Sequence, residues 1–335
     1  MRQRSWQRHC RALLVAILLS SGAVGSPCPV RRPEATFPLP AGAYLNYREA
    51  GQGDRVLVAL HGFGASLDTW NDIEPLWTHN YRVFMVDLLG FGLSAKPKHF
   101  GYTVTEQAES VAAFLEFVNR QTGRTITVIG HSYGGSIAMA AWLTLKDRHR
   151  TVIDAIVLID GLGFPEAVHF PLYINILRVP VVNRLVLTVI PQKCRARIVL
   201  DRVFYRRALV TPARVCMYAQ FLGLPGSHRA LIRTARQLGS PKNFEQFRRR
   251  IAEIDVPTLI IWGAHDQLIP PSQAGLLLHA IKTAHQPPML EAGHVPHEEL
   301  PKSTASLIDA FLNASDYGLI SLPTTLNKSM PIPNE

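Results

Sequence analysis

The sequence is poor in cysteine and in charge, and it has no fixed-period repeat. Four cysteines occur in 335 residues, without a CxxC pair or a Cys/His spacing typical of a zinc site. The 24 prolines and 23 glycines are spread along the chain, which excludes a collagen-like repeat and a long coiled coil. Because only 18% of the residues are charged and 47% are hydrophobic, the chain can bury a large core and is not predominantly disordered.

The charge that is present is unbalanced. The 35 Lys and Arg against 25 Asp and Glu give a net charge of +10. Such a charge is typical of proteins that bind nucleic acid or an anionic membrane surface, and also of some basic soluble enzymes. Residues 164–250 hold sixteen Lys and Arg but only three acidic residues. No nucleic-acid recognition motif accompanies this cluster, so we expect no nucleic-acid partner. The cluster instead predicts a cationic segment that can contact an anionic membrane.

The first 25 residues have the order of a secretory signal peptide. Four arginines precede an apolar run from Ala12 to Leu19, and small residues follow through Ser26. Ala23 and Gly25 fit a cleavage site, so we expect cleavage after Gly25 and an exported, periplasmic or secreted protein. The apolar stretch of about 14 residues is shorter than the roughly 20 needed to span a bilayer. An uncleaved membrane anchor is the alternative.

Cleavage would leave three cysteines, Cys28, Cys194 and Cys216. An exported protein can pair two of them, and Cys194 and Cys216 are the closest in the sequence. Sequence alone does not establish that bond, and three free thiols are the alternative.

From Ala41 onward, short apolar runs alternate with helix-like segments. Runs rich in Val and Ile, expected as strands, lie at 55–60, 81–86, 125–129, 155–159 and 258–262, after an earlier strand at 44–48. Helical spacing occurs at 105–120, 136–146 and 272–282. The alternation predicts an α/β fold with a doubly wound, mostly parallel central sheet flanked by helices.

The alternation stops between about Phe164 and Ile251, which predicts a mostly helical cap inserted between two core strands. The expected organisation is a signal peptide or anchor (1–25), a first part of the core (41–163), the helical cap (164–251), a second part of the core (252–312) and a flexible tail (313–335).

The motif most informative about chemistry is GHSYG, residues 130–134, followed by Gly135. It matches G-x-S-x-G between a predicted strand and a small-residue helix, where a sharp turn exposes the serine hydroxyl above the sheet. Glycines flank the serine because a Cβ would clash in such a turn. We therefore predict Ser132 as a nucleophile, with Gly130, His131, Gly134 and Gly135 supporting the motif.

A serine hydroxyl needs a positioned base to become a nucleophile. In this architecture the order along the chain is Ser, then Asp or Glu, then His. Asp266 follows a predicted strand, and His294 follows the apolar residues 287–290. We predict that His294 takes the serine proton and that Asp266 orients and stabilises the imidazole. His297 is the competing base, and Asp160, after strand 155–159, is the competing acid.

Two further loops follow predicted strands. In His61-Gly62-Phe63-Gly64 the glycines let the backbone approach the serine, and the Phe63 and Tyr133 N–H groups are the predicted oxyanion hole. An ordinary strand-end turn is the alternative for residues 61–64. DLLGFGLS, residues 87–94, is interpreted as a structural loop in which Asp87 bonds local backbone.

The motifs HGFG, DLLGFGLS, GHSYGG, GAHD and EAGH, in this order, resemble the α/β-hydrolase superfamily over roughly Ala41 to Leu312. They are similar to its cap-bearing esterases and lipases. The resemblance implies an α/β-hydrolase fold, a triad of Ser132, Asp266 and His294, and oxyanion donors at Phe63 and Tyr133. Haloalkane dehalogenases and epoxide hydrolases of this fold use an aspartate nucleophile, so serine at position 132 argues against both.

The sequence therefore predicts a serine hydrolase that cleaves carboxylic esters of apolar acids or lipids, without cofactor or metal. A carbon–carbon bond hydrolase or an acyltransferase on the same machinery is the first alternative. A non-catalytic lipid-binding or ligand-binding module is a more distant one. Residues 172–190 are unusually apolar, with Arg178 and Arg184 as their only charges. Such a cap could cover an acyl pocket and touch anionic lipid, or its apolar residues could simply pack on the core.

Overall fold

The computed structural model describes residues 28–165, 168, 172–238 and 241–316. The predicted signal segment 1–25 and residues 317–335 of the predicted tail lie outside this part of the chain. Among the described residues, none of the helices combines the length and the apolar character that a membrane span requires.

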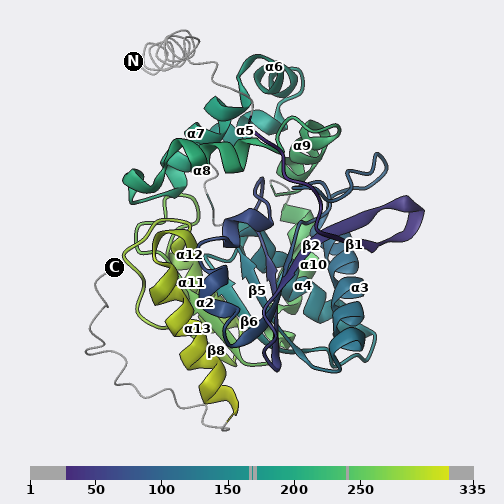
Figure 1. The fold of residues 1–335 in the computed structure, drawn as a ribbon, viewed down its shortest axis with the longest axis vertical. Helices are drawn as coiled ribbons and strands as arrows, with labels where there is room; N and C mark the ends of the chain where they lie inside the picture. Colours follow the sequence, from purple (N-terminus) through teal and green to yellow (C-terminus); the bar gives the residue numbers. More distant parts are fainter. Residues whose placement is uncertain (1–27, 166–167, 169–171, 239–240, 317–335) are drawn as a thin grey trace.

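An eight-stranded sheet forms the centre of the molecule (Figure 1). Its order is β1-β2-β4-β3-β5-β6-β7-β8, and only β1 and β2 run antiparallel to their neighbours. The strands are β1 (Ala35–Pro38), β2 (Tyr44–Ala50), β3 (Arg55–Leu60), β4 (Tyr81–Val86), β5 (Ile126–His131), β6 (Ile153–Ile159), β7 (Thr258–Ile261) and β8 (Ala284–His285). The prediction of a mostly parallel sheet is confirmed.

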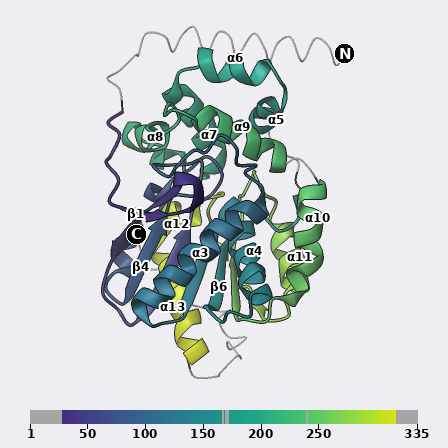
Figure 2. The ribbon, with the colours of Figure 1, turned by 90° about the vertical axis from the view of Figure 1, so that its right-hand side faces the viewer.

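The core strands are apolar along their whole length because both faces of the sheet are covered. In β3, Val56 and Val58 belong to one buried cluster, and Leu57 and Ala59 belong to the cluster on the other face. Buried residues of α3 (Val104–Thr122), α4 (Tyr133–Asp147) and α11 (Ser272–Ala280) join the first cluster. Those of α2 (Glu74–Trp77) and α13 (Pro301–Asp316) join the second. The sheet is thus sandwiched between helices (Figure 2). Its side chains alternate between two hydrophobic layers.

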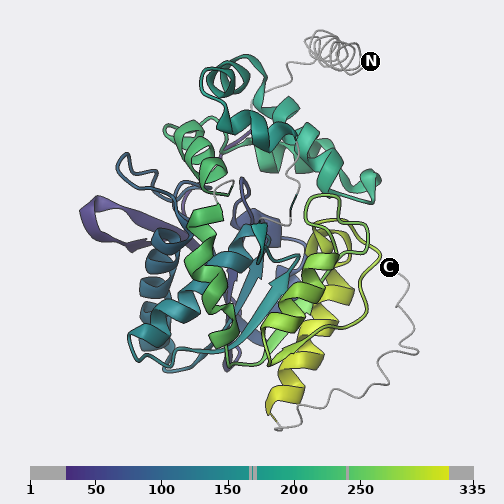
Figure 3. The same cartoon turned by 180° about the vertical axis from the view of Figure 1, so that it is seen from behind.

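The chain between β6 and β7 is helical, as predicted. It contains α5 (Leu172–Arg178), α6 (Val182–Val189), α7 (Gln192–Val203), α8 (Pro212–Ala219), α9 (Ser227–Leu238) and α10 (Pro241–Arg250). Helices α5 to α9 lie together at one end of the sheet, above the core, and we call them the cap (Figure 3). Helix α10 instead returns to the core, because Phe244 and Phe247 pack in the same cluster as the buried residues of α4.

Several elements were not expected from the sequence, among them strands β1 and β8 and helix α13. Strands β1 and β8 have four and two residues, and both pair only at the edges of the sheet. Such short edge strands carry no apolar periodicity that a pattern could reveal. Helix α13 continues to Asp316, four residues past the expected end of the core.

One disulfide joins the segment before β1 to the cap, between Cys28 and Cys216 on α8. The pairing of Cys194 with Cys216, considered from the sequence, is therefore wrong, and Cys194 is not disulfide-bonded. The reason is the course of the N-terminal segment. The Arg31 guanidinium pairs with the buried Asp87 at 3.1 Å and lies over the Phe221 ring of the cap, which brings Cys28 beside α8.

Candidate active site

Ser132 occupies the turn between β5 and α4, and its backbone is strained. Its φ of 52° and ψ of −119° lie outside the regions that a residue with a Cβ prefers. The Ser132 N–H donates to the Ile159 carbonyl at the end of β6, and the Ser132 carbonyl accepts from the Leu162 N–H, both at 3.0 Å. The neighbouring strand thus holds the turn, and the side chain of Ser132 is lifted above the carboxyl end of the sheet.

The glycines around this turn permit contacts that a side chain would prevent. A Cβ on Gly130 would lie 2.5 Å from the Gly134 carbonyl oxygen, so β5 and α4 can meet at this angle only without it. A Cβ on Gly62 would lie 2.9 Å from His131 Nδ1 and 3.1 Å from the Ser132 Cβ. Gly62 therefore lets residues 61–64 come directly against the serine, as the sequence suggested.

Two hydrogen bonds connect Ser132, His294 and Asp266. The Ser132 Oγ lies 2.9 Å from His294 Nε2, and Nδ1 of the same ring lies 2.7 Å from Asp266 Oδ2. The other oxygen of Asp266 accepts hydrogen bonds from the N–H groups of Leu268 and Ile269, at 2.7 and 2.9 Å. All three side chains are buried, so the array is preorganised and largely shielded from water.

His131 positions the loop that carries His294. Its Nε2 lies 2.7 Å from the His294 carbonyl oxygen. Burial, and then the neighbouring His297 and His294, hold the pKa of His131 well below its usual value, so the ring is neutral and Nε2–H is the donor. Among the described residues, Nδ1 of His131 has no hydrogen-bond partner, which is consistent with an acceptor atom facing the site.

Asp160, the competing acid, lies beside Asp266. One ligand-type atom each from Asp160, Asp266 and His294 lies within 4.8 Å of the others. Oδ1 of Asp160 accepts from the Gly263 N–H at 3.0 Å, while His294 bonds Asp266. Burial, and then the charge of Asp266, raise the pKa of Asp160 well above its usual range, so Asp160 is a neutral acid.

Asp160, Asp266 and His294 are close enough together to hold a metal ion, but each of them already forms hydrogen bonds with groups of the protein. The 2.7 Å separation of His294 Nδ1 and Asp266 Oδ2 suits a shared hydrogen, with the imidazole proton between the two atoms.

His297, the competing base, faces away from the serine. Its Nε2 lies 3.0 Å from Thr69 Oγ1, and its ring packs against Trp70 with the centroids 4.5 Å apart. Burial lowers the pKa of His297 to about 3, so this ring is a neutral core histidine.

His61 fixes the loop 61–64. The Leu88 N–H donates to His61 Nε2 at 3.0 Å, which leaves the hydrogen on Nδ1, and Nδ1–H donates to the Gly62 carbonyl at 2.7 Å. Phe63 follows directly and lines the same pocket as Ser132 and Tyr133. Tyr133 is the first residue of α4, so its N–H has no partner within the helix. Both predicted oxyanion donors thus belong to the walls of one site.

Asp87 is a buried structural residue, as interpreted from the sequence. Its carboxylate accepts hydrogen bonds from the Leu67 N–H at 2.7 Å, the Leu93 N–H at 2.8 Å and the Asn46 side chain at 2.7 Å. It also pairs with Arg31, a contact that the sequence did not indicate. Asp87 therefore ties three loops together beneath the site.

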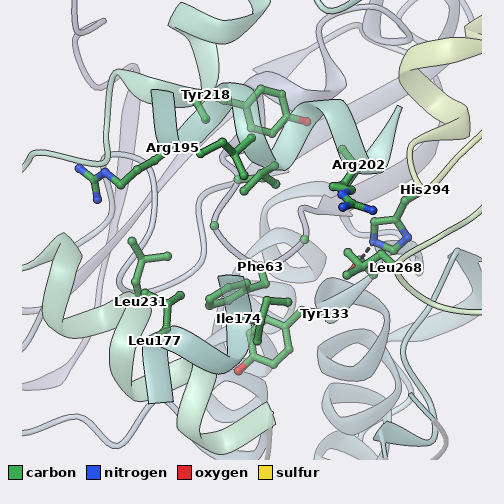
Figure 4. Close-up of a pocket in the computed structure, with 18 of the residues that line it drawn as sticks. Phe63, Tyr133, Ile174, Leu177, Arg195, Arg202, Tyr218, Leu231, Leu268 and His294 are labelled. Atoms are coloured by element: carbon green, nitrogen blue, oxygen red, sulfur yellow. Dashed lines mark hydrogen bonds between the residues drawn. The ribbon is translucent and has the colours of Figure 1, made fainter. Parts of the chain in front are cut away.

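A cavity of about 510 Å³ opens over Ser132 between the cap and the core. Its size is that of a site for a small organic ligand. Leucines, isoleucines and valines of α5, α6, α7 and α9 form much of its cap side (Figure 4). Ser132, His294, Phe63 and Tyr133 line the core side.

The sequence motifs do not include three polar residues of the cap that line this cavity, Arg195, Arg202 and Tyr218. Arg195 and Arg202 are both on α7, two helical turns apart, so their spacing was the available signal. The Tyr218 hydroxyl donates to the buried Glu298 of the core, next to His297. No motif carries this contact, because it joins residues 80 positions apart.

Comparison with known proteins gives a family match over most of the chain. The profile described as "Alpha/beta hydrolase family" matches residues 57–307. This range spans both parts of the core and the cap, and it contains Ser132, Asp266 and His294.

Relatives named for different activities have similar levels of sequence identity to this chain. Lipase 3 of Moraxella sp. is 28% identical over 260 residues, which is 76% of each chain. A 2-hydroxy-6-oxononadienedioate/2-hydroxy-6-oxononatrienedioate hydrolase of Paraburkholderia xenovorans is 28% identical over 261 residues, 75% of this chain and 84% of that protein. An acetyltransferase component of an acetoin cleaving system from Cupriavidus necator is also 28% identical, but this chain spans only 58% of its length.

Solved structures agree on the fold. The epoxide hydrolase CorEH superimposes with a TM-score of 0.70 over 84% of this chain and 98% of that one, at 20% sequence identity. At this identity the similarity shows the fold alone, and the reaction has to be argued from the site.

Proposed function

This chain belongs to the alpha/beta hydrolase family, and from that premise we propose that it is a serine hydrolase of carboxylic esters. The observation that carries the proposal is the continuous hydrogen-bonded series Ser132–His294–Asp266 at the base of an apolar cavity. A nucleophile, a base and an orienting carboxylate are the groups that acyl transfer through serine requires.

In the proposed mechanism, Ser132 Oγ attacks the ester carbonyl while His294 Nε2 takes the hydroxyl proton. Asp266 accepts the hydrogen bond from Nδ1 and stabilises the imidazolium that forms. His294 then gives the proton to the leaving alcohol, which produces an acyl-enzyme. A water molecule, deprotonated by His294, attacks this acyl-enzyme. When the bond to Ser132 Oγ breaks, His294 returns the proton to this oxygen and the acid is released.

The negative charge that develops on the carbonyl oxygen needs donors. The Phe63 and Tyr133 N–H groups are the proposed ones, and each such donor contributes roughly 3–4 kcal/mol of transition-state stabilisation. The amino end of α4 adds a positive electrostatic potential at the same place.

The lining of the cavity supports an apolar acyl group. Leu172, Ile174, Leu177, Leu187 and Leu231 all contribute to its wall. Burying a methylene group of the substrate here contributes about 0.8 kcal/mol, so kcat/KM should rise with acyl length until the cavity is filled.

The test is hydrolysis of p-nitrophenyl esters of increasing acyl length by the wild type, Ser132→Ala and Ser306→Ala. Ser306 is an exposed serine of α13 and serves as the matched control. We expect Ser132→Ala to lose at least 10³-fold in kcat and Ser306→Ala to keep full activity. Undiminished activity of Ser132→Ala would refute the mechanism.

Carbon–carbon bond cleavage is the alternative reaction, because one relative is a 2-hydroxy-6-oxononadienedioate/2-hydroxy-6-oxononatrienedioate hydrolase. A wild type that cleaves such a compound but no ester would favour this alternative. A protein inert to both, and unlabelled by a fluorophosphonate, would favour a binding module. Acyl transfer would appear as ester product when an added alcohol competes with water.

We further propose that the protein is exported. The disulfide between Cys28 and Cys216 supports this, because such bonds persist in oxidising compartments. Expression of the full chain in a bacterium should give a periplasmic or secreted form that begins at Ser26. An unprocessed amino terminus in the membrane fraction would support the anchor instead.

Contact with an anionic membrane through the cap is the third part of the proposal. In the described part of the chain, seven of the fourteen exposed large hydrophobic residues lie in α5 to α7: Leu172, Val179, Val181, Val182, Leu185, Val189 and Ile198. We call them the cap patch. These side chains do not pack on the core, and α6 lies at the end of the molecule farthest from the sheet (Figure 1). Apolar side chains within a cationic segment suit the interface of an anionic bilayer.

A further inference from the structure

The cavity over Ser132 contains positive charge but no acidic side chain among its described lining residues. Apart from His131 and His294, the ionisable side chains of its wall are those of Arg195, Arg202, Tyr133 and Tyr218. A site that takes only a neutral apolar chain gains nothing from a guanidinium, because burying this charge is costly.

Arg195 is the more buried of the two arginines. Its Nε is inaccessible to solvent and has no hydrogen-bond partner in the described ranges. Burial lowers the pKa of Arg195, which means that its charge is poorly solvated. No ion pair with a carboxylate of the described chain compensates it.

A second nitrogen in the same condition lies nearby. His228 Nε2, on α9, is also buried without a partner among the described residues. Burial, and then the charge of Arg195, lower the pKa of His228. His228 is not one of the residues that line the cavity, so it acts as a neighbour of Arg195. An oxyanion in the cavity would pair with the Arg195 guanidinium, whose Nε lacks a partner in the described ranges.

Arg195 and the catalytic histidine lie on opposite sides of the cavity. Figure 4 shows Arg195 and His294 at opposite sides of the view, with Arg202 on the same side as His294. Arg195 and Arg202 are seven residues apart on α7, about 10 Å along the helix axis.

We propose that Arg195 binds an oxyanion, a carboxylate or a phosphate, at the far end of the apolar chain of the substrate, and that His228 assists it. The substrate is then an ester at one end, apolar in the middle and anionic at the other end. This inference rests on the proposed ester hydrolysis. The planar guanidinium suits either oxyanion, because two parallel N–H groups can bind two oxygens.

The test compares two esters that differ only in the distal charge, 4-nitrophenyl hydrogen octanedioate and its methyl ester. We expect the wild type to prefer the anionic ester by at least tenfold in kcat/KM, which corresponds to about 1.4 kcal/mol. Arg195→Leu and Arg195→Gln should abolish the preference and leave kcat/KM for the methyl ester within about threefold. The retained activity on the methyl ester also reports that the variants fold.

Two further variants locate the effect. Arg197 lies on α7 but pairs with Asp201 at 2.9 Å and does not line the cavity, so Arg197→Leu should keep the preference. Arg202→Leu should also keep it for the long chain, because Arg202 lies at the catalytic end. Equal rates for the two esters in the wild type, or an undiminished preference in Arg195→Leu, would overturn the proposal.

If the protein does not hydrolyse esters, the same experiment gives a different result. A wild type inert to both esters would refute ester hydrolysis, and calorimetric binding of octanedioate to the wild type and to Arg195→Leu would then test the anion site directly. Octyl phosphate and octanoate as inhibitors separate the two oxyanions. The one whose inhibition weakens at least tenfold in Arg195→Leu is the group that this site prefers, and no weakening for either contradicts the proposal.

Discussion

Two neighbouring aspartates differ in role because of their surroundings. Asp266 accepts hydrogen bonds from two backbone N–H groups and from the His294 ring. Asp160 receives a single backbone N–H, is fully buried and faces the charge of Asp266. Each follows a core strand at the carboxyl edge of the sheet, so only the hydrogen bonds distinguish them.

Exchange of each aspartate for asparagine should therefore have unequal effects. Asp160→Asn replaces a neutral acid by a neutral amide of the same shape, so kcat/KM for an ester should change less than about threefold. Asp266→Asn favours the wrong imidazole tautomer and should lower kcat by roughly 10³–10⁴-fold. Steady-state kinetics of both variants test this.

A truncating variant separates catalysis from stability at the same position. Asp160→Ala leaves the buried Gly263 N–H unpaired and should lower the free energy of unfolding by about 1–3 kcal/mol. If Asp160→Asn were as inactive as Asp266→Asn, Asp160 would have to act as a charged acid, contrary to its environment.

At the scale of elements, helix α8 connects the cap to the core and to the segment before β1. Its Cys216 is bonded to Cys28, and its Tyr218 and Arg214 both bond Glu298, at the start of the last core segment. The Arg214 guanidinium also lies over the Phe204 ring. The cap is thus held on one side by a covalent bond and on the other by a buried polar cluster.

Loss of the disulfide should destabilise the protein without removing the site. The bond closes a segment of 188 residues, and a double variant Cys28→Ser/Cys216→Ser should lose about 2–4 kcal/mol in the free energy of unfolding. Urea denaturation with and without reductant measures this.

The same double variant provides the control. Reductant should lower the stability of the wild type toward that of the variant and leave the variant itself unchanged. Equal stability of the oxidised wild type and the variant would show that the bond contributes nothing to the folded state.

The polar cluster predicts a dependence of stability on pH. Burial raises the pKa of Glu298 from 4.5 to about 7, so between these values the folded protein holds a proton that the unfolded chain has released. The folded state then binds more protons, and this group's contribution to the free energy of unfolding falls as pH rises through that window, by at most about 3 kcal/mol.

Glu298→Gln should remove this slope. As pH rises from 5 to 7, we expect the free energy of unfolding of the wild type to fall relative to that of Glu298→Gln. Above pH 8 the difference between the two should be constant. Denaturation at several pH values provides the measurement. A difference independent of pH would mean that Glu298 titrates near its ordinary pKa.

At the scale of the whole molecule, charge and apolar surface meet on the cap. Residues 172–238, which contain α5 to α9, hold twelve Lys and Arg against one acidic residue. This excess of eleven positive charges exceeds the net charge of the complete chain, +10, so the remainder of the protein is less basic than the total suggests. The cap patch lies within the same segment, and Leu172 and Ile198 belong both to the patch and to the cavity wall. A lipid substrate could therefore pass from a membrane to the site along an apolar path.

Vesicle binding tests this surface. The protein should bind vesicles that contain anionic phospholipid more tightly than neutral ones, and added salt should weaken the binding. Val181→Ser/Leu185→Ser, at two of the most exposed positions, should weaken binding to anionic vesicles at least tenfold. Leu276→Ser/Leu278→Ser, exposed on α11 of the core, is the matched control. Equal affinity for both kinds of vesicle would exclude the proposal.

The core strands and the motifs could be predicted from the sequence alone. Residues 55–60 and 81–86 form strands with the expected bounds, because a continuous apolar run buried on both faces is a local signal. The turn at Ser132 was recognisable for a similar reason, since strand, glycines and helix are adjacent in the chain. What the sequence could not determine were the edge strands β1 and β8, which are short and owe their place to pairing alone.

Where the sequence offers two residues of the same type for one role, the tertiary structure shows which of them makes the contact. It bonded His294 rather than His297 to Ser132, Asp266 rather than Asp160 to His294, and Cys28 rather than Cys194 to Cys216. It also places Arg195 of the cap in the wall of the cavity that contains Ser132. These contacts join residues 28 to 188 positions apart, and their distances depend on how the cap and the loops pack on the sheet, which no local pattern of residues contains.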